Sequence, residues 1–235
     1  MMRKEEAMTD STFADFVLAH EVIGFFDQPI RLKSGRLSHF YVNWRPASND
    51  AALLDTLTEH LVDFIESERL PCKTLYGVPE GATKTAVIAA FKLAKRSPHF
   101  QVGSHTIAMG RAKPKLHGDP ADRYFIGAPG SGTYVLEDTI TTGLSLFQCL
   151  DQLIAAGVDV KGVISLTDRC EVRGDGLTAA EYLAQHYQGK ISYHPLSRAP
   201  ELLALAVQKQ HPPLALVEAL AKELNTTASR LSGET

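Results

Sequence analysis

The sequence predicts an α/β protein in which helices flank a mostly parallel β-sheet. Between residues 74 and 166, short apolar runs typical of buried strands alternate with amphipathic helical patterns, and this alternation is typical of parallel sheets with helices on both faces. With 44% apolar and 22% charged residues, the composition is that of a globular chain rather than a disordered one. A length of 235 residues suits one large domain, or a domain with additions.

Charge and cysteine content exclude several classes of protein. The formal net charge is −3, from 24 Lys and Arg against 27 Asp and Glu, so no global basic field exists to hold nucleic acid. Three scattered cysteines are too few for a disulfide framework or a zinc site. The first ten residues carry charges with no apolar run behind them, unlike a signal peptide, and no apolar run has the length of a bilayer span. We therefore expect a cytoplasmic protein without nucleic-acid or membrane partners.

The N-terminal part is expected to hold two helices and a hairpin. A helix capped by Asp10 or Ser11 fits the apolar positions up to Ile23. Residues 31–45 interleave apolar and polar side chains around a Ser-Gly pair and predict a short hairpin. An apolar stripe opposite Asp and Glu predicts a helix over 50–67.

Strands and helices are then expected in alternation. Strands are predicted over 74–78, 133–136 and 160–166, with a further one within 99–108, and helices over 85–95 and 144–156. Residues 110–132 lack apolar periodicity and predict a long flexible loop, such as a lid or binding loop. The tail after residue 199 shows two helical patterns separated by Pro212 and Pro213, with a frayed end over 226–235.

A strand-to-helix turn over residues 133–145 carries the clearest chemistry. Glu137 and Asp138 follow the strand, and a turn of small residues, 139–143, opens the next helix. Successive backbone N–H groups of such a turn, with the positive end of the helix dipole, bind phosphate. Carboxylates beside that phosphate can contact ribose hydroxyls or Mg²⁺-bound waters. The spacing is that of neither a GxGxxG fingerprint nor a Walker A loop.

This segment resembles the 5-phosphoribosyl-1-diphosphate (PRPP) motif of the type I phosphoribosyltransferases. That motif is a hydrophobic strand, two acidic residues, a threonine-rich turn with glycine, and a helix, and the order here is the same. A capped helix after an edge strand, with two surface acids, is the alternative, but a run of this order rarely arises by chance.

Two further segments resemble the orotate phosphoribosyltransferases within that group. Residues 111–118, RAKPKLHG, are similar to the family's catalytic loop, Arg-Lys-x-x-Lys-x-His-Gly, with Ala112 at the first Lys and Lys113 one place later. A solvated charged loop is the alternative for this run. Residues 32–41, LKSGRLSHFY, resemble the N-terminal element that contacts orotate, although its aromatic pair also suits ordinary packing.

Two more segments follow in the family's order. Residues 165–171, SLTDRCE, resemble a strand end whose arginine pairs with the orotate carboxylate. The alternative for Arg169 is a salt bridge with Asp168 or Glu171. Residues 76–86, YGVPEGATKTA, resemble the diphosphate-binding loop, but Glu80-Gly81 stand where the family often has a Lys or an aromatic residue.

The resemblance implies one type I phosphoribosyltransferase domain over 1–235, made of an N-terminal hood (12–50), an α/β core (50–200) and a C-terminal helical extension (200–235). It implies transfer of the 5-phosphoribosyl group from PRPP to orotate in pyrimidine biosynthesis, giving orotidine 5′-monophosphate and diphosphate. It also implies Mg²⁺ held through PRPP and waters, with no direct metal ligands, and a homodimer with shared active sites.

Residue roles follow from the matching positions. The implied catalytic residues are Arg111, Lys113, Lys115, His117 and Asp138. The implied PRPP-binding residues are Glu80, Gly81, Glu137, Asp138, Thr139, Ile140, Thr141, Thr142, Gly143, Leu144 and Ser145. The implied orotate-binding residues are Lys33, Phe40, Tyr41, Thr141 and Arg169.

Three other interpretations stay open at this point. A phosphoribosyltransferase for a purine or uracil would keep residues 137–145, but it would not need Lys33 and Arg169 to bind a carboxylate on its base. A regulator on the same fold would bind PRPP or a nucleotide without catalysis, which the departures at Ala112 and Glu80 allow. An unrelated phosphate-binding α/β protein would require the ordered motifs to be coincidental.

Overall fold

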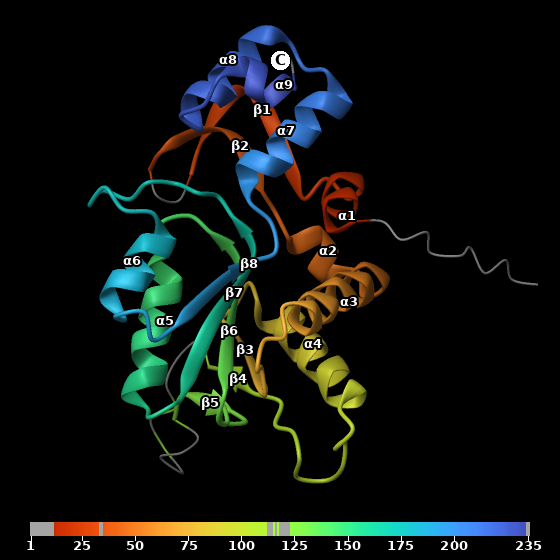
Figure 1. Ribbon diagram of the computed structural model, residues 1–235, viewed down its shortest axis with the longest axis vertical. Coiled ribbons are helices and arrows are strands. Elements are labelled where there is room, and N and C mark those ends of the chain that lie inside the picture. Colours follow the sequence, from red (N-terminus) through yellow and green to blue (C-terminus); the bar gives the residue numbers. More distant parts are fainter. Residues whose placement is uncertain (1–11, 33–34, 112–114, 116, 118–122, 234–235) are drawn as a thin grey trace, which may run out of the picture.

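A parallel sheet in the order β3-β6-β7-β8 forms the centre of the chain (Figure 1). The computed structural model describes residues 12–32, 35–111, 115, 117 and 123–233. The strands are β3 (Thr74–Gly77), β6 (Thr133–Ile140), β7 (Val160–Asp168) and β8 (Ser192–Pro195). All neighbouring strands run parallel, so their carboxyl ends lie at one edge of the sheet.

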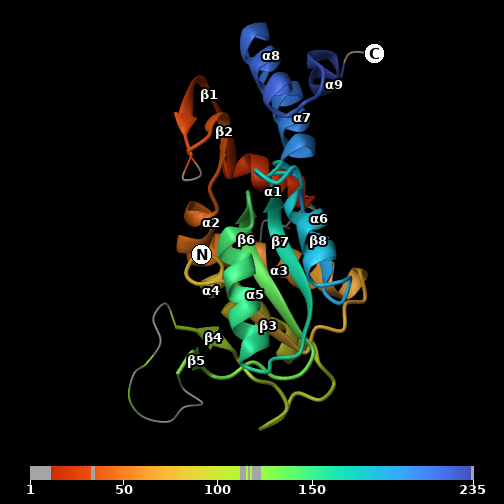
Figure 2. The same ribbon diagram turned by 90° about the vertical axis from the view of Figure 1, so that its left-hand side faces the viewer.

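Helices cover both faces of this sheet, which explains why its central strands are buried over most of their length. Helices α3 (Ala51–Ser67) and α4 (Thr83–Arg96) lie on one face, and α5 (Leu144–Ala155) and α6 (Ala179–His186) on the other (Figures 1 and 2). Along β6, Leu136 packs into the core on the α3 side, whereas Val135 packs into the core on the α5 side. The predicted α/β class is thereby confirmed.

The N-terminal segment differs from its prediction in where the first helix ends. Helix α1 spans Phe13–Ala19, and Ile23 belongs to β1 (Ile23–Arg31) rather than to the helix. The reason is a reversal at Glu21, whose φ of 51° is left-handed, with the Val22 N–H donating to the Val17 carbonyl at 3.0 Å. Thr12 caps the helix, and the expected caps at residues 10 and 11 lie outside the described residues.

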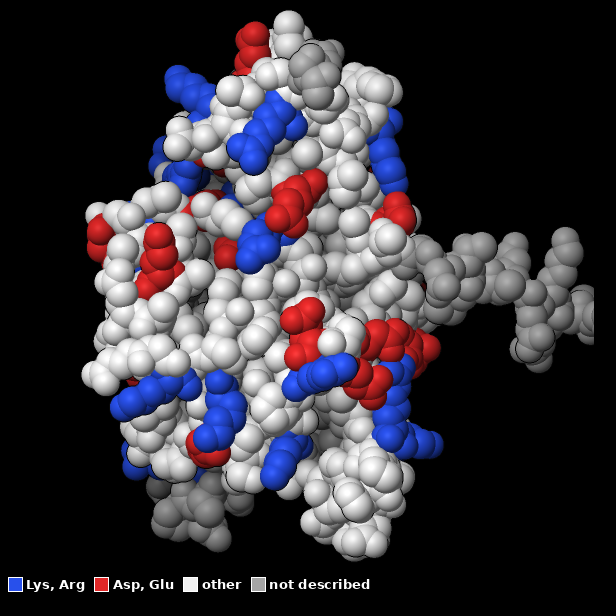
Figure 3. Space-filling view, viewed as in Figure 1, with Lys and Arg blue, Asp and Glu red and all other residues white. Residues whose placement is uncertain are grey.

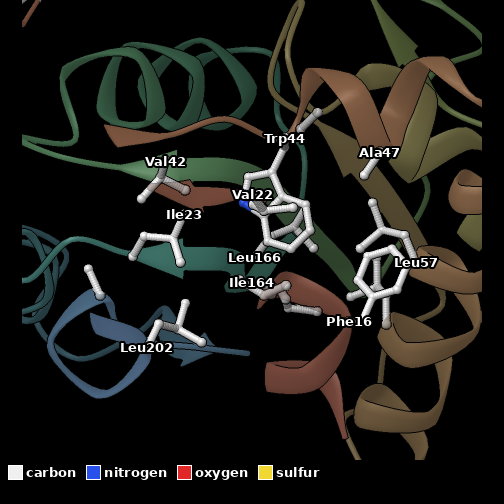
Figure 4. Close-up of a cluster of buried hydrophobic side chains, with 14 of the residues drawn as sticks. Phe16, Val22, Ile23, Val42, Trp44, Ala47, Leu57, Ile164, Leu166 and Leu202 are labelled. Atoms are coloured by element: carbon white, nitrogen blue, oxygen red, sulfur yellow. The ribbon is translucent and has the colours of Figure 1, made fainter. Parts of the chain in front are cut away.

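The hood hairpin pairs β1 with β2 (Leu37–Val42), and the short helix α2 (Arg45–Asn49) follows. Trp44, between them, is buried and donates its indole N–H to the Thr167 hydroxyl of β7 at 3.2 Å. Figure 4 shows how this indole lies among side chains from α1, α3, the hairpin and β7. One continuous core therefore fixes the hood to the sheet.

The C-terminal tail forms three helices, α7 (Ala199–Gln210), α8 (Leu214–Glu223) and α9 (Ala228–Ser232). The frayed end expected over 226–235 is thus wrong for the α9 residues. Thr227 caps α9, and Leu231 is buried in the same core as the hood. Figure 2 shows the three helices beside the β1–β2 hairpin.

The strand expected within 99–108 is absent from the structure, which describes all of these residues. Two turns occur there instead, with the Phe100 N–H donating to Ser97 and the Ser104 N–H donating to Gln101, and Val102 is fully exposed. A small antiparallel pair, β4 (Met109–Gly110) and β5 (Phe125–Ile126), lies at the base of the predicted long loop.

Acidic and basic side chains are interspersed on the face shown in Figure 3. Between α3 and α4, for example, Arg96 pairs with Glu59, Asp63 and Glu66. None of the helices in the described ranges combines the length and the apolar character needed to cross a bilayer.

Candidate functional site

A small cavity lies in the turn between β6 and α5. Residues 139–146 line it together with Glu137, and its volume is about 190 Å³. No side chain caps the first turn of α5 within the described structure, so its backbone N–H groups can bind a ligand. The structure therefore brings together all of the predicted phosphate-binding residues of this turn, from Thr139 to Ser145.

Gly143 allows this turn to close, since its φ is +75° and an added Cβ would lie 2.6 Å from a ring carbon of Phe147. We expect Gly143→Ala to cost about 1–2 kcal/mol of stability from the left-handed backbone alone, and to raise the KM for PRPP because Phe147 must shift. Gly157→Ala is the matched control, because Gly157 has φ of +78° but nothing within 4 Å of the added Cβ. Thermal unfolding and PRPP titrations of both variants test this, and an unchanged KM in Gly143→Ala would contradict it.

A second cavity of about 620 Å³ adjoins the acidic pair. Its lining includes six residues predicted to contact PRPP or the departing diphosphate, namely Glu80, Gly81, Arg111, Glu137, Asp138 and Ser145. The loop after β3 comes so close to β6 that a Cβ on Gly81 would lie 2.6 Å from Asp138 Oδ2. No side chain, and hence no lysine, fits at position 81 without moving Asp138.

The two carboxyl groups at the end of β6 differ in environment. Glu137 is buried, and this burial, with the neighbouring Asp138, raises its pKa well above the ordinary value. Its Oε2 atom has no hydrogen-bond partner among the described residues. Asp138 is half-buried and accepts the Thr139 N–H at 2.7 Å. Glu137 thus has an acceptor available for a hydroxyl or a cation, whereas Asp138 already stabilises the turn.

The base of the long loop brings one predicted catalytic cation to the cavity. Arg111 lines it, with its Nε donating to the Phe125 carbonyl at 3.2 Å. Lys115 and His117 are exposed and do not line the cavity. The Lys115 N–H donates to the Arg123 carbonyl at 2.8 Å, which continues the β4–β5 pairing outwards. The predicted Lys113 lies outside the described residues.

Two of the five predicted orotate-binding residues, Phe40 and Arg169, meet at the carboxyl end of β7, whereas Thr141 lies in the turn after β6. Arg169 is 2% exposed, its guanidinium lies 3.9 Å from the centre of the Phe40 ring, and its Nε donates to Glu171 at 2.6 Å. The salt bridge considered as an alternative is therefore present. Tyr41 is 37% exposed, as expected from its alternate position on the strand. The predicted Lys33 lies outside the described residues.

Arg45 is a cavity residue that sequence reasoning missed. It is exposed, begins α2 and lines the larger cavity beside Glu80 and Gly81. The charged lining of that cavity is otherwise three acids and Arg111, so Arg45 supplies positive charge that the loop at position 81 cannot. The signal in the sequence was indirect: the loop over residues 76–86 has Glu80-Gly81 where the family often has a lysine or an aromatic residue, so the cation had to come from elsewhere.

We expect Arg45→Ala to raise the KM for PRPP about tenfold, because charge-assisted hydrogen bonds to a diphosphate are worth more than neutral ones. The KM for the base should stay within about twofold, a difference of under half a kcal/mol. Arg230→Ala, on the exposed side of α9, is the control. Initial-rate kinetics decide the matter, and an unchanged PRPP affinity would show that Arg45 does not contact the diphosphate.

A parallel sheet whose β6 ends in two acids and a threonine-rich turn, beneath an N-terminal hood, defines the type I phosphoribosyltransferase class. The crystal structure of orotate phosphoribosyltransferase from Francisella tularensis has this fold, with a TM-score of 0.66 at 20% identity, covering 89% of this chain and 96% of that one. No model of a known protein family matches the chain.

Sequence relatives then identify the family. The orotate phosphoribosyltransferase of Methylococcus capsulatus is 30% identical over 170 residues, covering 72% of this chain and 76% of that protein. The orotate phosphoribosyltransferase of Actinobacillus succinogenes is 29% identical over 187 residues, covering 76% and 80%. This chain belongs to the orotate phosphoribosyltransferase family, which confirms the resemblance identified from its motifs.

Proposed function

We propose that this chain transfers the 5-phosphoribosyl group of PRPP to orotate, giving orotidine 5′-monophosphate and diphosphate. One observation carries the proposal: the phosphate turn after β6 and the buried arginine after β7 lie at adjacent strand ends. The backbone N–H of Arg169 donates to the backbone carbonyl of Ile140 at 2.9 Å, which joins the end of β7 to the end of β6. A phosphorylated ribose and an anionic base can thus be held side by side.

The phosphate turn would hold the 5-phosphate of PRPP, through backbone N–H groups and the hydroxyls of Thr141, Thr142 and Ser145. Glu137 and Asp138 would bind the ribose hydroxyls. The acid pair also suits a Mg²⁺ ion held through substrate and water, and that ion would neutralise charge on the diphosphate. Among the described residues, no group of three or more His, Cys, Asp and Glu side chains is placed to ligate a metal directly.

In the reaction, the bond from the ribose anomeric carbon to the diphosphate oxygen breaks, a bond to the orotate ring nitrogen forms, and the proton of that nitrogen is released to the diphosphate or to solvent. The electron pair of the broken bond leaves with the diphosphate, and positive charge develops on the ribose. This chain contributes positioning and electrostatics. Arg111 and the cations of the long loop would stabilise the departing diphosphate, and Arg169 would face the orotate carboxylate, for which its forked guanidinium is suited.

One specific observation keeps the non-catalytic regulator as a second candidate. Glu80 lies in the larger cavity, and Asp138 occupies the space that a side chain at position 81 would need. The negative charge of these side chains would repel a diphosphate. PRPP could then bind in the cavity while its diphosphate group departs only slowly.

A steady-state assay separates the two candidates. The purified chain is mixed with PRPP and Mg²⁺, and loss of orotate absorbance is followed, with uracil, hypoxanthine and adenine as parallel acceptors. Consumption of orotate alone supports the proposed function, and consumption of another base replaces it. No turnover with any base, together with PRPP binding by calorimetry, would favour the regulator.

The homodimer with shared active sites and the cytoplasmic location stay predictions of the family resemblance. Sedimentation velocity tests the dimer directly. If the long loop serves the partner's site, mixing a loop variant with a phosphate-turn variant should restore activity.

A further inference from the structure

Four charged side chains meet where helix α8, strand β2 and the end of β7 come together. Arg169 of this group pairs with Glu171 at 2.6 Å, and Arg36 approaches Glu171 to 3.6 Å. Glu223, the last residue of α8, approaches Arg169 to 3.9 Å. Two cations thus alternate with two acids, and all except Arg36 are nearly inaccessible to solvent.

Glu223 also binds the backbone of the hood. Its Oε2 accepts the N–H of His39 at 2.8 Å, and its backbone carbonyl accepts from Arg36 Nη2 at 3.4 Å. Its Oε1 is buried and has no hydrogen-bond partner among the described residues. A buried carboxylate so placed costs free energy unless a nearby cation offsets it, and Arg169 is that cation.

The hairpin itself explains why His39 needs this contact. Strand β2 pairs with β1 in register at Phe40↔Phe25 and at Ser38↔Ile30, so the β1 residues 26–29 bulge opposite His39. The irregular strand leaves the N–H of His39 pointing to α8, where Glu223 accepts it. Helix α8 therefore supplies an acceptor for a backbone N–H at the irregularity between Phe25 and Ile30.

The two neighbours of His39 also hold Arg169, in addition to Glu171. Ser38 Oγ accepts from Arg169 Nη2 at 3.0 Å, and the Phe40 carbonyl accepts from Nη1 at 3.4 Å. The ring of Phe40 stacks on the guanidinium. A shift of β2 at His39 would consequently move two of the groups that orient Arg169.

We propose that Glu223 is a positioning residue for the base: it holds β2 and Arg169 in the geometry that receives the orotate carboxylate. The inference rests on the proposed function for the identity of that base. It assigns to the C-terminal helices a role in base binding, in addition to their packing against the hood.

The test is a comparison of kinetic constants in Glu223→Ala, with Glu218→Ala as control, because Glu218 is exposed on the same helix. We expect the KM for orotate to rise about tenfold, as for loss of a charged hydrogen bond in a buried site, with the KM for PRPP unchanged. Glu223→Gln keeps an acceptor for the His39 N–H and should recover most of the loss. Amide exchange of residues 37–42 should quicken in Glu223→Ala and stay unchanged in the control.

Several results would overturn the inference. They are an unchanged KM for orotate, an equal rise in both KM values, or no recovery in Glu223→Gln. If Glu223→Ala does not fold, Glu223→Asp takes its place: it keeps the charge but is one methylene too short to reach His39, and it should raise the KM for orotate severalfold. An unaltered chain that consumes no orotate refutes the proposed function itself, while amide exchange still shows whether Glu223 holds β2.

Discussion

Replacing Lys115 with alanine is expected to lower kcat for orotate consumption by about a hundredfold or more, the usual cost of removing one group that stabilises charge in a transition state. Lys115 lies just beyond the β4–β5 pair, on the exposed stem of the long loop. The motif implies that its charge acts only as the diphosphate departs, so kcat should fall much more than KM for either substrate changes.

The control for this variant is Lys190→Ala, which removes an exposed lysine between α6 and β8. Both variants should unfold at the temperature of the unaltered chain, because neither side chain is buried. A Lys115→Ala enzyme that retains more than half of kcat would show that the loop of this chain does not perform the role its motif implies.

Replacing Arg169 with methionine is expected to combine the largest loss of stability with loss of orotate binding. The guanidinium is 2% exposed and pairs with Glu171, whose side chain is 6% exposed. Removing one partner of a buried ion pair costs about 3–5 kcal/mol, and here Glu223 also loses its nearby cation. Chemical unfolding should therefore show a lower free energy of unfolding for this variant.

Arg169→Lys separates stability from base recognition, because lysine keeps the charge but cannot reproduce the fork of hydrogen bonds to Glu171, Ser38 and Phe40. We expect a folded enzyme whose KM for orotate is at least tenfold raised, since about 1.4 kcal/mol of binding energy is enough for that change. Arg198→Met, which removes only an exposed 3.9 Å pair with Glu201, is the control. A normal KM for orotate in Arg169→Lys would place the carboxylate elsewhere.

Elements with strong local periodicity were predictable from the sequence. Helix α3 begins after its cap, Asp50, within a residue of the prediction, and α5 ends as expected before Gly157. Strand β6 was predicted too short, because its acidic pair was taken to end it, whereas backbone pairing with β7 continues to Ile140. Carboxylates are tolerated in a strand that ends at a cavity.

Other elements depend on signals that are weak or distant. Helix α6 was missed although Thr178 and Glu181 form a capping box that the sequence displays. The end of α1 was placed too late, because Glu21 has a left-handed backbone and glutamate rarely adopts that conformation. Helix α9 forms because Leu231 reaches the core of the hood, a contact that the polar end of the chain does not suggest.

The sequence by itself determined the family, through five segments in order, and it predicted the phosphate-binding turn. The residues of each segment are adjacent along the chain, and the local geometry of the turn follows from the residue types at 137–145. Only the tertiary structure showed that Arg45 lines the same cavity as Glu80 and Gly81, and that Glu223 accepts the backbone N–H of His39 in the hood. His39 and Glu223 are 184 residues apart in the chain. Contacts at such separations arise from packing of helices on the sheet, and no local pattern encodes them.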